Sequence, residues 1–113
     1  MNFDLTKQQI ELREKVHDFA EREVRPVAAY SDENEVFDVE LTREMADRGL
    51  LGICVPKEYG GQELDTLSYI IAVEELSRVD GSTAATIAAD NSLGISPIKE
   101  YGTKEQKEKY LPR

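Results

Sequence analysis

The segment "LSYIIAVEELSRV", residues 67–79, decides the fold. Its apolar residues fall on more than one side of a helical wheel, and they are Leu67, Ile70, Ile71, Val73, Leu76 and Val79. A helix that is apolar on most of its surface is normally buried between neighbouring elements. We therefore expect a central helix from Leu67 to Val79 that is buried on both sides. Asp65 or Thr66 is expected to cap its N-terminus.

Two helices are predicted on the N-terminal side of this segment. Thr6 and Gln9 have the spacing of a capping box, and an apolar stripe follows at helical spacing: Leu12, Val16, Phe19, Ala20 and Val24. Pro26 should end or kink this first helix because it lacks a backbone donor. The second helix is expected over residues 38–48, with Asp38 at its N-cap and Gly49 just beyond its C-terminus.

The connection between residues 50 and 65, "LLGICVPKEYGGQELD", interrupts the helical pattern. Its apolar first part, residues 50–56, is too short and too rich in Gly and Pro for a helix, so we expect it to cross the core in an extended form. Gly60 and Gly61 are expected to allow positive φ and a sharp reversal, with Tyr59 packed against the turn. The segment contains no base, nucleophile or phosphate-binding loop.

An alanine-rich helix is predicted after the central helix, capped at Ser82. Pro97 should start or kink a short turn that Gly102 closes. Thr103 and Gln106 form a second capping box ahead of the helix "KEQKEKY". The fold class is therefore all-α, an irregular bundle of five to six helices in one domain, residues 1–113.

The chain is acidic, with a net charge of −9 at pH 7. This charge argues against nucleic acid or an anionic membrane as a partner, because phosphates would be repelled. No segment approaches the roughly 20 apolar residues of a membrane span. The N-terminus "MNFDLTKQQ" does not resemble a targeting leader. We expect a cytoplasmic protein, or one in the mitochondrial matrix if a transit peptide has been removed.

The residues alone indicate no catalytic centre and no metal site, since one Cys and one His cannot supply a ligand set. Cys54 is expected to be a buried, inert thiol. Glu74 and Glu75 are adjacent on a helix and point in different directions, so we expect one to be solvated and the other to pair with an Arg or Lys. The alanine-rich helix has two open interpretations, which are close helix packing and one wall of an apolar ligand groove.

Three stretches carry a family resemblance: "FDLTKQQIELREKVHDFAEREVRPVAA", "GLLGICVPKEYGGQELDTLSYIIAVEELSRVDGSTA" and "NSLGISPIKEYGTKEQKEKYLP". In this order and at this spacing, they resemble the N-terminal helical domain of the acyl-CoA dehydrogenases, most closely the short-chain, butyryl-CoA type. The resemblance implies a flavoenzyme that uses FAD to form a double bond in an acyl-CoA thioester. It also implies a homo-oligomer that passes electrons to an electron-transferring flavoprotein.

The resemblance implies two sites on this chain. In the family, the helix that matches "AATIAADNSLG" lines the acyl pocket, which points to Ala85, Thr86, Ala89 and Leu93 as substrate-binding residues. Some members dock the electron-transfer partner on an apolar patch of this domain, and the corresponding residues are Leu64, Leu67 and Ile71. For these three residues, burial in the core is the alternative.

The sequence departs from the family pattern where it ends, at Arg113, since the middle β domain and the C-terminal helical domain do not follow. In the family, those domains carry the catalytic Glu and most of the FAD site. We therefore expect the 113 residues alone to be inactive and not to hold FAD tightly. The alternatives are a stand-alone helical interaction module that keeps the scaffold without catalysis, and another flavoenzyme such as a nitroalkane oxidase or a flavin monooxygenase.

Overall fold

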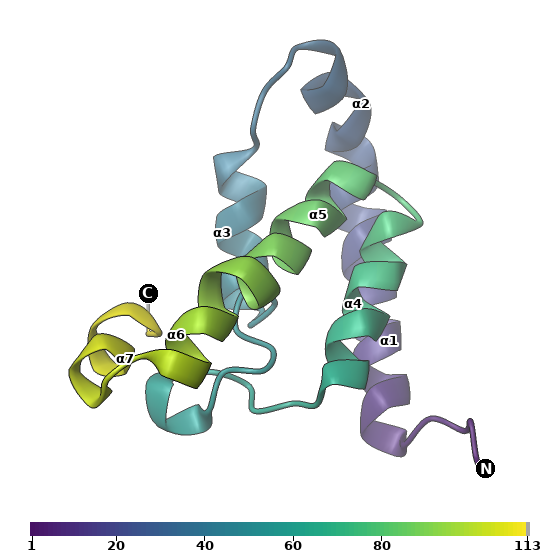
Figure 1. Cartoon of the computed structure of the whole chain (residues 1–113). Coiled ribbons are helices and arrows are strands. Elements are labelled where there is room, and N and C mark those ends of the chain that lie inside the picture. The colour runs from purple at the N-terminus through teal and green to yellow at the C-terminus, as the bar shows by residue number, and fades with distance from the viewer. Residues whose placement is uncertain (113) are drawn as a thin grey trace.

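The computed structural model describes residues 1–112, and those residues form helices and no strand (Figure 1). The helices are α1 (Lys7–Phe19), α2 (Arg25–Glu33), α3 (Val39–Asp47), α4 (Thr66–Ser77), α5 (Gly81–Ala89), α6 (Ile95–Tyr101) and α7 (Lys104–Tyr110). Two π-helical turns, η1 (Ala20–Val24) and η3 (Asp90–Gly94), join α1 to α2 and α5 to α6, and η2 (Lys57–Tyr59) is a short 3₁₀ turn. The described residues thus form five helical rods, which confirms the all-α prediction.

The first rod runs without a break from Lys7 to Glu33. Its capping box is confirmed, because the backbone N–H of Gln9 donates to Thr6 Oγ1 and the N–H of Thr6 donates to Gln9 Oε1. Pro26 does not end the helix. The turn before it is π-helical, with the N–H of Arg25 donating to the carbonyl of Ala20 five residues back. This wider turn precedes the position at which proline removes a donor, and the helix continues beyond it.

Helix α3 has the predicted caps at both ends. The N–H of Leu41 donates to Asp38 Oδ1 at 2.9 Å. Gly49 takes a positive φ of 78° and its N–H donates to the carbonyl of Ala46, while the N–H of Leu50 donates to Met45. These two bonds define a Schellman motif, which reverses the chain after the helix.

Residues 50–56 cross the core, but the predicted extended form is wrong. The segment consists of turns, with the N–H of Gly52 donating to Gly49 at 3.2 Å and that of Val55 donating to Gly52 at 3.4 Å. Ile53 and Val55 are buried, as the apolar composition predicts. Residues 62–64, after the glycine turn, donate further backbone hydrogen bonds to this segment, including Leu64 N–H to Ile53 O at 2.8 Å. Because nearby residues satisfy its backbone in this way, the segment needs no strand partner.

The two adjacent glycines of this connection have different roles. Gly60 has a φ of +86°, which confirms the predicted positive φ. Gly61 lies against the backbone of Val55 instead, and a Cβ placed on it would be 2.1 Å from the Val55 carbonyl oxygen. Gly61 is therefore required for a close approach and not for a positive φ.

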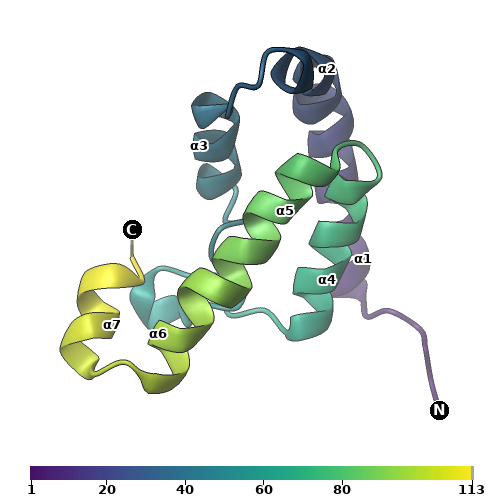
Figure 2. The same cartoon turned by 45° about the horizontal axis from the view of Figure 1, so that its top comes forward.

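Helix α4 lies between α1 and α5 and contacts both (Figures 1 and 2). Asp65 is its N-cap, accepting from the N–H of Ser68. Its central position is as predicted, but burial on all sides is not, because Leu67 is 47% and Ile70 is 48% exposed. The main core is formed by these helices together with α3 and the connection after it. It comprises Val16, Phe19, Ala20, Val24, Leu41, Met45, Leu50, Ile53, Ala72, Leu76, Ala84 and Ile87.

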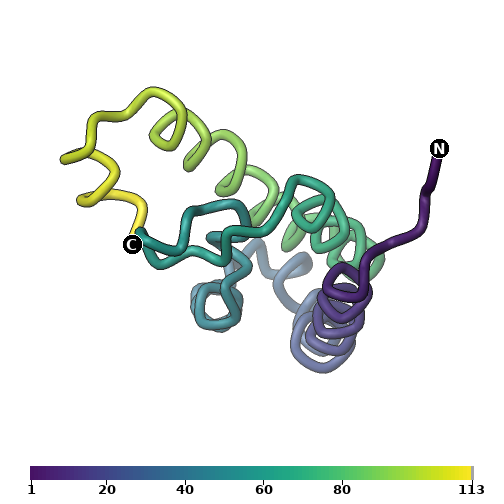
Figure 3. The backbone as a smooth tube through the Cα atoms, turned by 90° about the horizontal axis from the view of Figure 1, so that it is seen from below, coloured from purple at the N-terminus to yellow at the C-terminus, as the bar shows by residue number. Residues whose placement is uncertain are grey.

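The last two rods differ from the prediction at two points. The N-cap of α5 is Asp80 and not Ser82, because Asp80 has the extended backbone of a cap and its carboxylate accepts from the N–H of Thr83. Pro97 lies within α6 and does not begin a new element. Thr103 caps α7 with the predicted capping box. Figure 3 shows α7 and the N-terminal segment at opposite ends of the molecule.

Candidate functional site

One face of the α5–η3–α6 rod is apolar and exposed. Ala85 and Ala89 are exposed on it, and Leu93 is 79% exposed. The opposite face is buried in the core through Ala84, Ile87 and other residues. Three of the four residues predicted to bind substrate therefore lie at the surface of one rod, spaced four residues apart.

Thr86, the fourth of these residues, is half-buried and faces another part of the structure. It lines a groove of about 360 Å³ between α2, the loop after it, α3 and the start of α5. Its hydroxyl donates to the carbonyl of Ser82 at 3.2 Å. The rim of this groove includes the exposed apolar residues Val36 and Phe37, which the sequence patterns did not single out.

A second groove, of about 470 Å³, lies between α1 and residues 48–64. We call it the α1 groove. Its apolar lining consists of Leu12, Val16, Phe19, Leu50 and Leu64. The guanidinium of Arg48 lies 4.7 Å from the ring centroid of Phe19, a cation–π contact at one side of the groove.

The three residues predicted to dock a partner have different environments. Leu64 is half-buried in the lining of the α1 groove, and Leu67 is 47% exposed on α4. Ile71 is only 7% exposed, so the structure places it in the interior. Of the three, Leu64 and Leu67 are therefore accessible to a partner and Ile71 is not.

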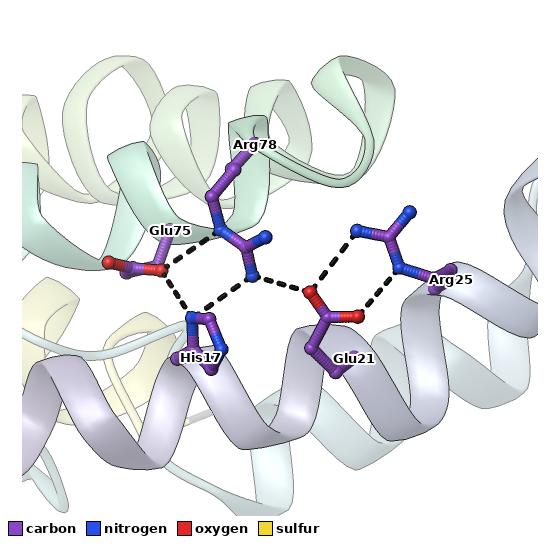
Figure 4. Close-up of polar contacts among 5 residues, drawn as sticks. All are labelled: His17, Glu21, Arg25, Glu75 and Arg78. Carbon is purple, nitrogen blue, oxygen red and sulfur yellow. Dashed lines mark hydrogen bonds and ion pairs between the residues drawn. The ribbon is translucent and has the colours of Figure 1, made fainter.

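A polar network joins α1 and α2 to α4 (Figure 4). Glu21 accepts from Arg25 at 2.6 Å and from Arg78 at 2.7 Å. These hydrogen bonds, first from Arg25 and then from Arg78, lower the pKa of Glu21 to about 2. Glu75 lies 3.1 Å from His17 Nδ1 and 3.4 Å from Arg78 Nε. The pairing predicted for one of the two adjacent carboxylates is confirmed at Glu75, and Glu74 is exposed.

Cys54 does not have the surroundings of a reactive thiol. It is half-buried, and burial raises the pKa of the thiol. A thiol with a raised pKa stays protonated near neutral pH and is a poor nucleophile. The side-chain contacts of His17 are made to Glu75 and Arg78, so His17 does not activate Cys54.

Residues 1–112 contain no cluster of three or more His, Cys, Asp or Glu side chains that could hold a metal ion. Within the same range, no helix combines the length and apolarity that crossing a membrane requires.

Asn91 is one of the buried polar residues that the sequence patterns missed. Its side chain makes three hydrogen bonds, which are Nδ2 to the carbonyls of Leu50 and Ile87 and Oδ1 from the N–H of Ile53. A single Asn within an Ala-rich helix gives no periodic signal. Only its unfavourable helix propensity, next to Ser92 and Gly94, could have drawn attention to this position.

Comparison with known proteins identifies the class. Residues 6–113 match the family model described as acyl-CoA dehydrogenase, N-terminal domain. The match spans the capped first rod, the glycine connection and the α5–η3–α6 rod. The chain therefore belongs to the acyl-CoA dehydrogenase family and corresponds to its N-terminal domain.

Individual relatives agree with this assignment. "Acyl-CoA dehydrogenase, short-chain specific" of Clostridium acetobutylicum is 52% identical over 111 residues, which is 98% of this chain and 29% of that protein. A solved structure described as "Electron transferring flavoprotein of Acidaminococcus fermentans: Towards a mechanism of flavin-based electron bifurcation" has TM-score 0.96 and 46% identity, covering 99% of this chain and 30% of that one. An acyl-CoA dehydrogenase complexed with FAD from Bacillus anthracis has TM-score 0.88 and 40% identity, covering 96% and 19%.

The chain thus spans less than a third of these relatives. The Bacillus anthracis relative is complexed with FAD, and the α1 groove is the larger of the two grooves described above. The lining of the α1 groove carries three carboxylates, those of Glu11, Asp18 and Glu23, and three cations, those of Lys15, Arg22 and Arg48. These charges balance, so the lining does not select for a pyrophosphate. This lining therefore supplies no feature that is specific to FAD.

Proposed function

We propose that this chain is the N-terminal domain of an FAD-dependent dehydrogenase of short acyl-CoA thioesters. The outer face of the α5–η3–α6 rod then forms part of the wall of the acyl pocket. The observation that carries this proposal is the exposed apolar row Ala85, Ala89 and Leu93 on a rod whose other face is in the core.

The chemistry of an acyl tail fits this face. Each methylene removed from water contributes about 0.8 kcal/mol, so an apolar wall favours binding of the tail. The methyl side chains of Ala85 and Ala89 let a tail approach the helix closely, and Leu93 offers a larger surface at one end of the row. Thr86 lines the groove between α2, α3 and α5 instead, so a contact with the substrate would be made from that side of the rod.

The test is Ala89→Phe in a full-length dehydrogenase that carries this domain. The ring would occupy the space of several methylenes, so long tails should lose kcat/KM relative to short ones by about fourfold for each methylene excluded. Ala46→Phe, the same change at an exposed position on α3, is the control. An unchanged ratio of activity on butyryl-CoA and octanoyl-CoA in Ala89→Phe would show that Ala89 does not line the pocket.

We also propose that an electron-transferring flavoprotein docks at the α1 groove and the adjoining start of α4. Its apolar contacts are Leu64 in the groove and Leu67 on α4, whereas Ile71 is buried. The α1 groove combines apolar side chains with many charged ones, and apolar contacts bordered by polar residues are common in protein interfaces. Leu64→Asp should reduce electron transfer to the partner while dye-linked turnover stays normal. Val39→Asp, at an exposed apolar position on α3, should change neither. Normal transfer to the partner in Leu64→Asp would contradict this site.

The flavin and the catalytic base are assigned to parts of the full-length homo-oligomer outside these 113 residues, in a cytoplasmic setting. The chemistry that FAD would supply there is acceptance of the hydride removed from the acyl chain. The chain alone is expected neither to hold FAD nor to oxidise acyl-CoA. A stable yellow colour after purification, or dye reduction with butyryl-CoA, would refute this part of the proposal.

A further inference from the structure

The proposed acyl wall contains a π-helical turn, η3, between Ala89 and Ile95. The N–H of Ile95 donates to the carbonyl of Asp90 five residues back. Such turns are wider than α-helical turns and leave nearby carbonyls without their regular partners. Something must satisfy those carbonyls if the turn is to persist.

Side chains supply donors at this point of the rod. Asn91 Nδ2 donates to the carbonyl of Ile87 at 2.9 Å. The carbonyl of Ala88 accepts from Ser92 Oγ at 2.6 Å and from the hydroxyl of Tyr69 on α4 at 2.9 Å. The donors thus come both from the turn itself and from the neighbouring helix.

Asn91 also anchors the turn to the core. The same Nδ2 donates to the carbonyl of Leu50 at 2.9 Å, and Oδ1 accepts from the N–H of Ile53 at 3.1 Å. Asn91 is 7% exposed, so these bonds are shielded from water. Among its neighbours in the turn, Asn91 binds the connection at residues 50–53 while Ser92 bonds only within the rod.

The turn changes the direction of the wall residues. With 3.6 residues per turn, positions four apart in a regular α-helix are rotated by about 40° from one another. The row Ala85, Ala89 and Leu93 would therefore drift around the helix. A π turn rotates less per residue, so it reduces the drift between Ala89 and Leu93 and keeps Leu93 on the side of the two alanines.

We propose that Asn91 is a positioning residue of the acyl wall: it holds the π turn that aligns Leu93 with Ala85 and Ala89. This inference rests on the proposed function of that face. Asn91 itself is buried and does not contact the substrate. It acts through the direction in which Leu93 points and through the distance of the wall from residues 50–53.

The test compares Asn91→Ala with Asn91→Ser in the full-length dehydrogenase. Alanine removes all three bonds. Serine retains a hydroxyl that can donate to the carbonyl of Ile87, as Ser92 does to Ala88, so it keeps the turn while losing the anchor. Leu41→Ala, in the core on α3, is the control for a general loss of stability. Amide hydrogen exchange of residues 90–95, in this chain and in the full-length protein, reports on the turn directly.

Asn91→Ala should change the ratio of kcat/KM for octanoyl-CoA and butyryl-CoA by about fourfold or more, the value of one methylene. It should also speed exchange at residues 90–95 beyond any global change. Asn91→Ser should change both readouts less. Leu41→Ala should lower stability without altering the ratio, which separates positioning from mere stabilisation.

The outcomes distinguish this inference from the proposed function. A change of the ratio in both Ala89→Phe and Asn91→Ala supports it. A change in Ala89→Phe alone overturns the role of Asn91 and leaves the acyl wall standing. An unchanged ratio in both variants overturns the wall and, with it, the role of Asn91.

Discussion

Substitution of Gly61 should unfold the connection between α3 and α4. A Cβ at this position would lie 2.1 Å from the carbonyl oxygen of Val55, 2.3 Å from its Cβ and 2.5 Å from its carbonyl carbon. Two of these atoms are backbone and the third belongs to a buried side chain, so none can rotate away. Relief requires residues 52–55 and 61–64 to separate, which breaks the bonds between Leu64 and Ile53 and between Glu63 and Val55.

The expected cost of Gly61→Ala is about 3 kcal/mol, the upper end for overpacking. For a domain of this size, that corresponds to a fall in Tm of about 10 °C or more. Thermal and urea unfolding followed by far-UV circular dichroism measures it. Two other glycines provide controls, since a Cβ on Gly60 or on Gly81 meets nothing within 4 Å.

The controls separate close approach from backbone conformation. Gly60→Ala should cost about 1 kcal/mol, because Gly60 has a positive φ. Gly81→Ala, in the first turn of α5, should be neutral or slightly stabilising. If Gly61→Ala were no more destabilising than Gly60→Ala, the close packing of Gly61 on Val55 would not be a determinant of the fold.

Three further predictions concern stability. The pKa of Glu21 is lowered from 4.5 to about 2, so its contribution to the free energy of unfolding is fully present above pH 4.5 and is lost as the pH falls towards 2. The stability difference between the wild-type chain and Glu21→Gln should therefore shrink over that pH range. A constant difference would contradict the pairing of Glu21 with Arg25 and Arg78. Burial raises the pKa of Asp90, so the ionised carboxylate opposes folding. Asp90→Asn should therefore raise the free energy of unfolding at neutral pH, as measured by urea titration. This stabilisation should vanish at a pH below the usual carboxyl pKa, where Asp90 is protonated in both the folded and the unfolded chain. Thr6→Ala removes a capping box and should cost about 1 kcal/mol, whereas Thr42→Ala, within α3, should cost less.

Much of the fold could be predicted because its signals are local. Thr6, Asp38 and Thr103 cap helices where the sequence predicts caps, since a cap depends on a few neighbouring residues. Gly49 ends α3 for the same reason. The effects of Pro26 and Pro97 on their helices were harder to predict, because each proline lies inside a rod that continues through it. A π turn precedes each of the two prolines, and no local sequence pattern predicted either turn.

The candidate site was predictable only in part. Resemblance to a family pointed to Ala85, Ala89 and Leu93, and the structure places all three on one exposed face. Leu64, Leu67 and Ile71 have similar apolar side chains, yet only Ile71 is buried. The exposure of Leu67 and Ile71 depends on which side of α4 meets α1 and α5, and a nearly uniform apolar pattern does not specify this.

The sequence by itself determined the all-α class, the positions of most helix caps and the membership of the chain in a dehydrogenase family, because these depend on local hydrogen bonding and on residue order. Only the tertiary structure decided how the connection at residues 50–64 folds. It also decided that Gly61 is needed for contact with Val55 and that Asn91 links the α5–η3–α6 rod to Leu50 and Ile53. The physical reason is the same in each case: these are contacts between residues far apart in the chain, which form only when the helices have packed.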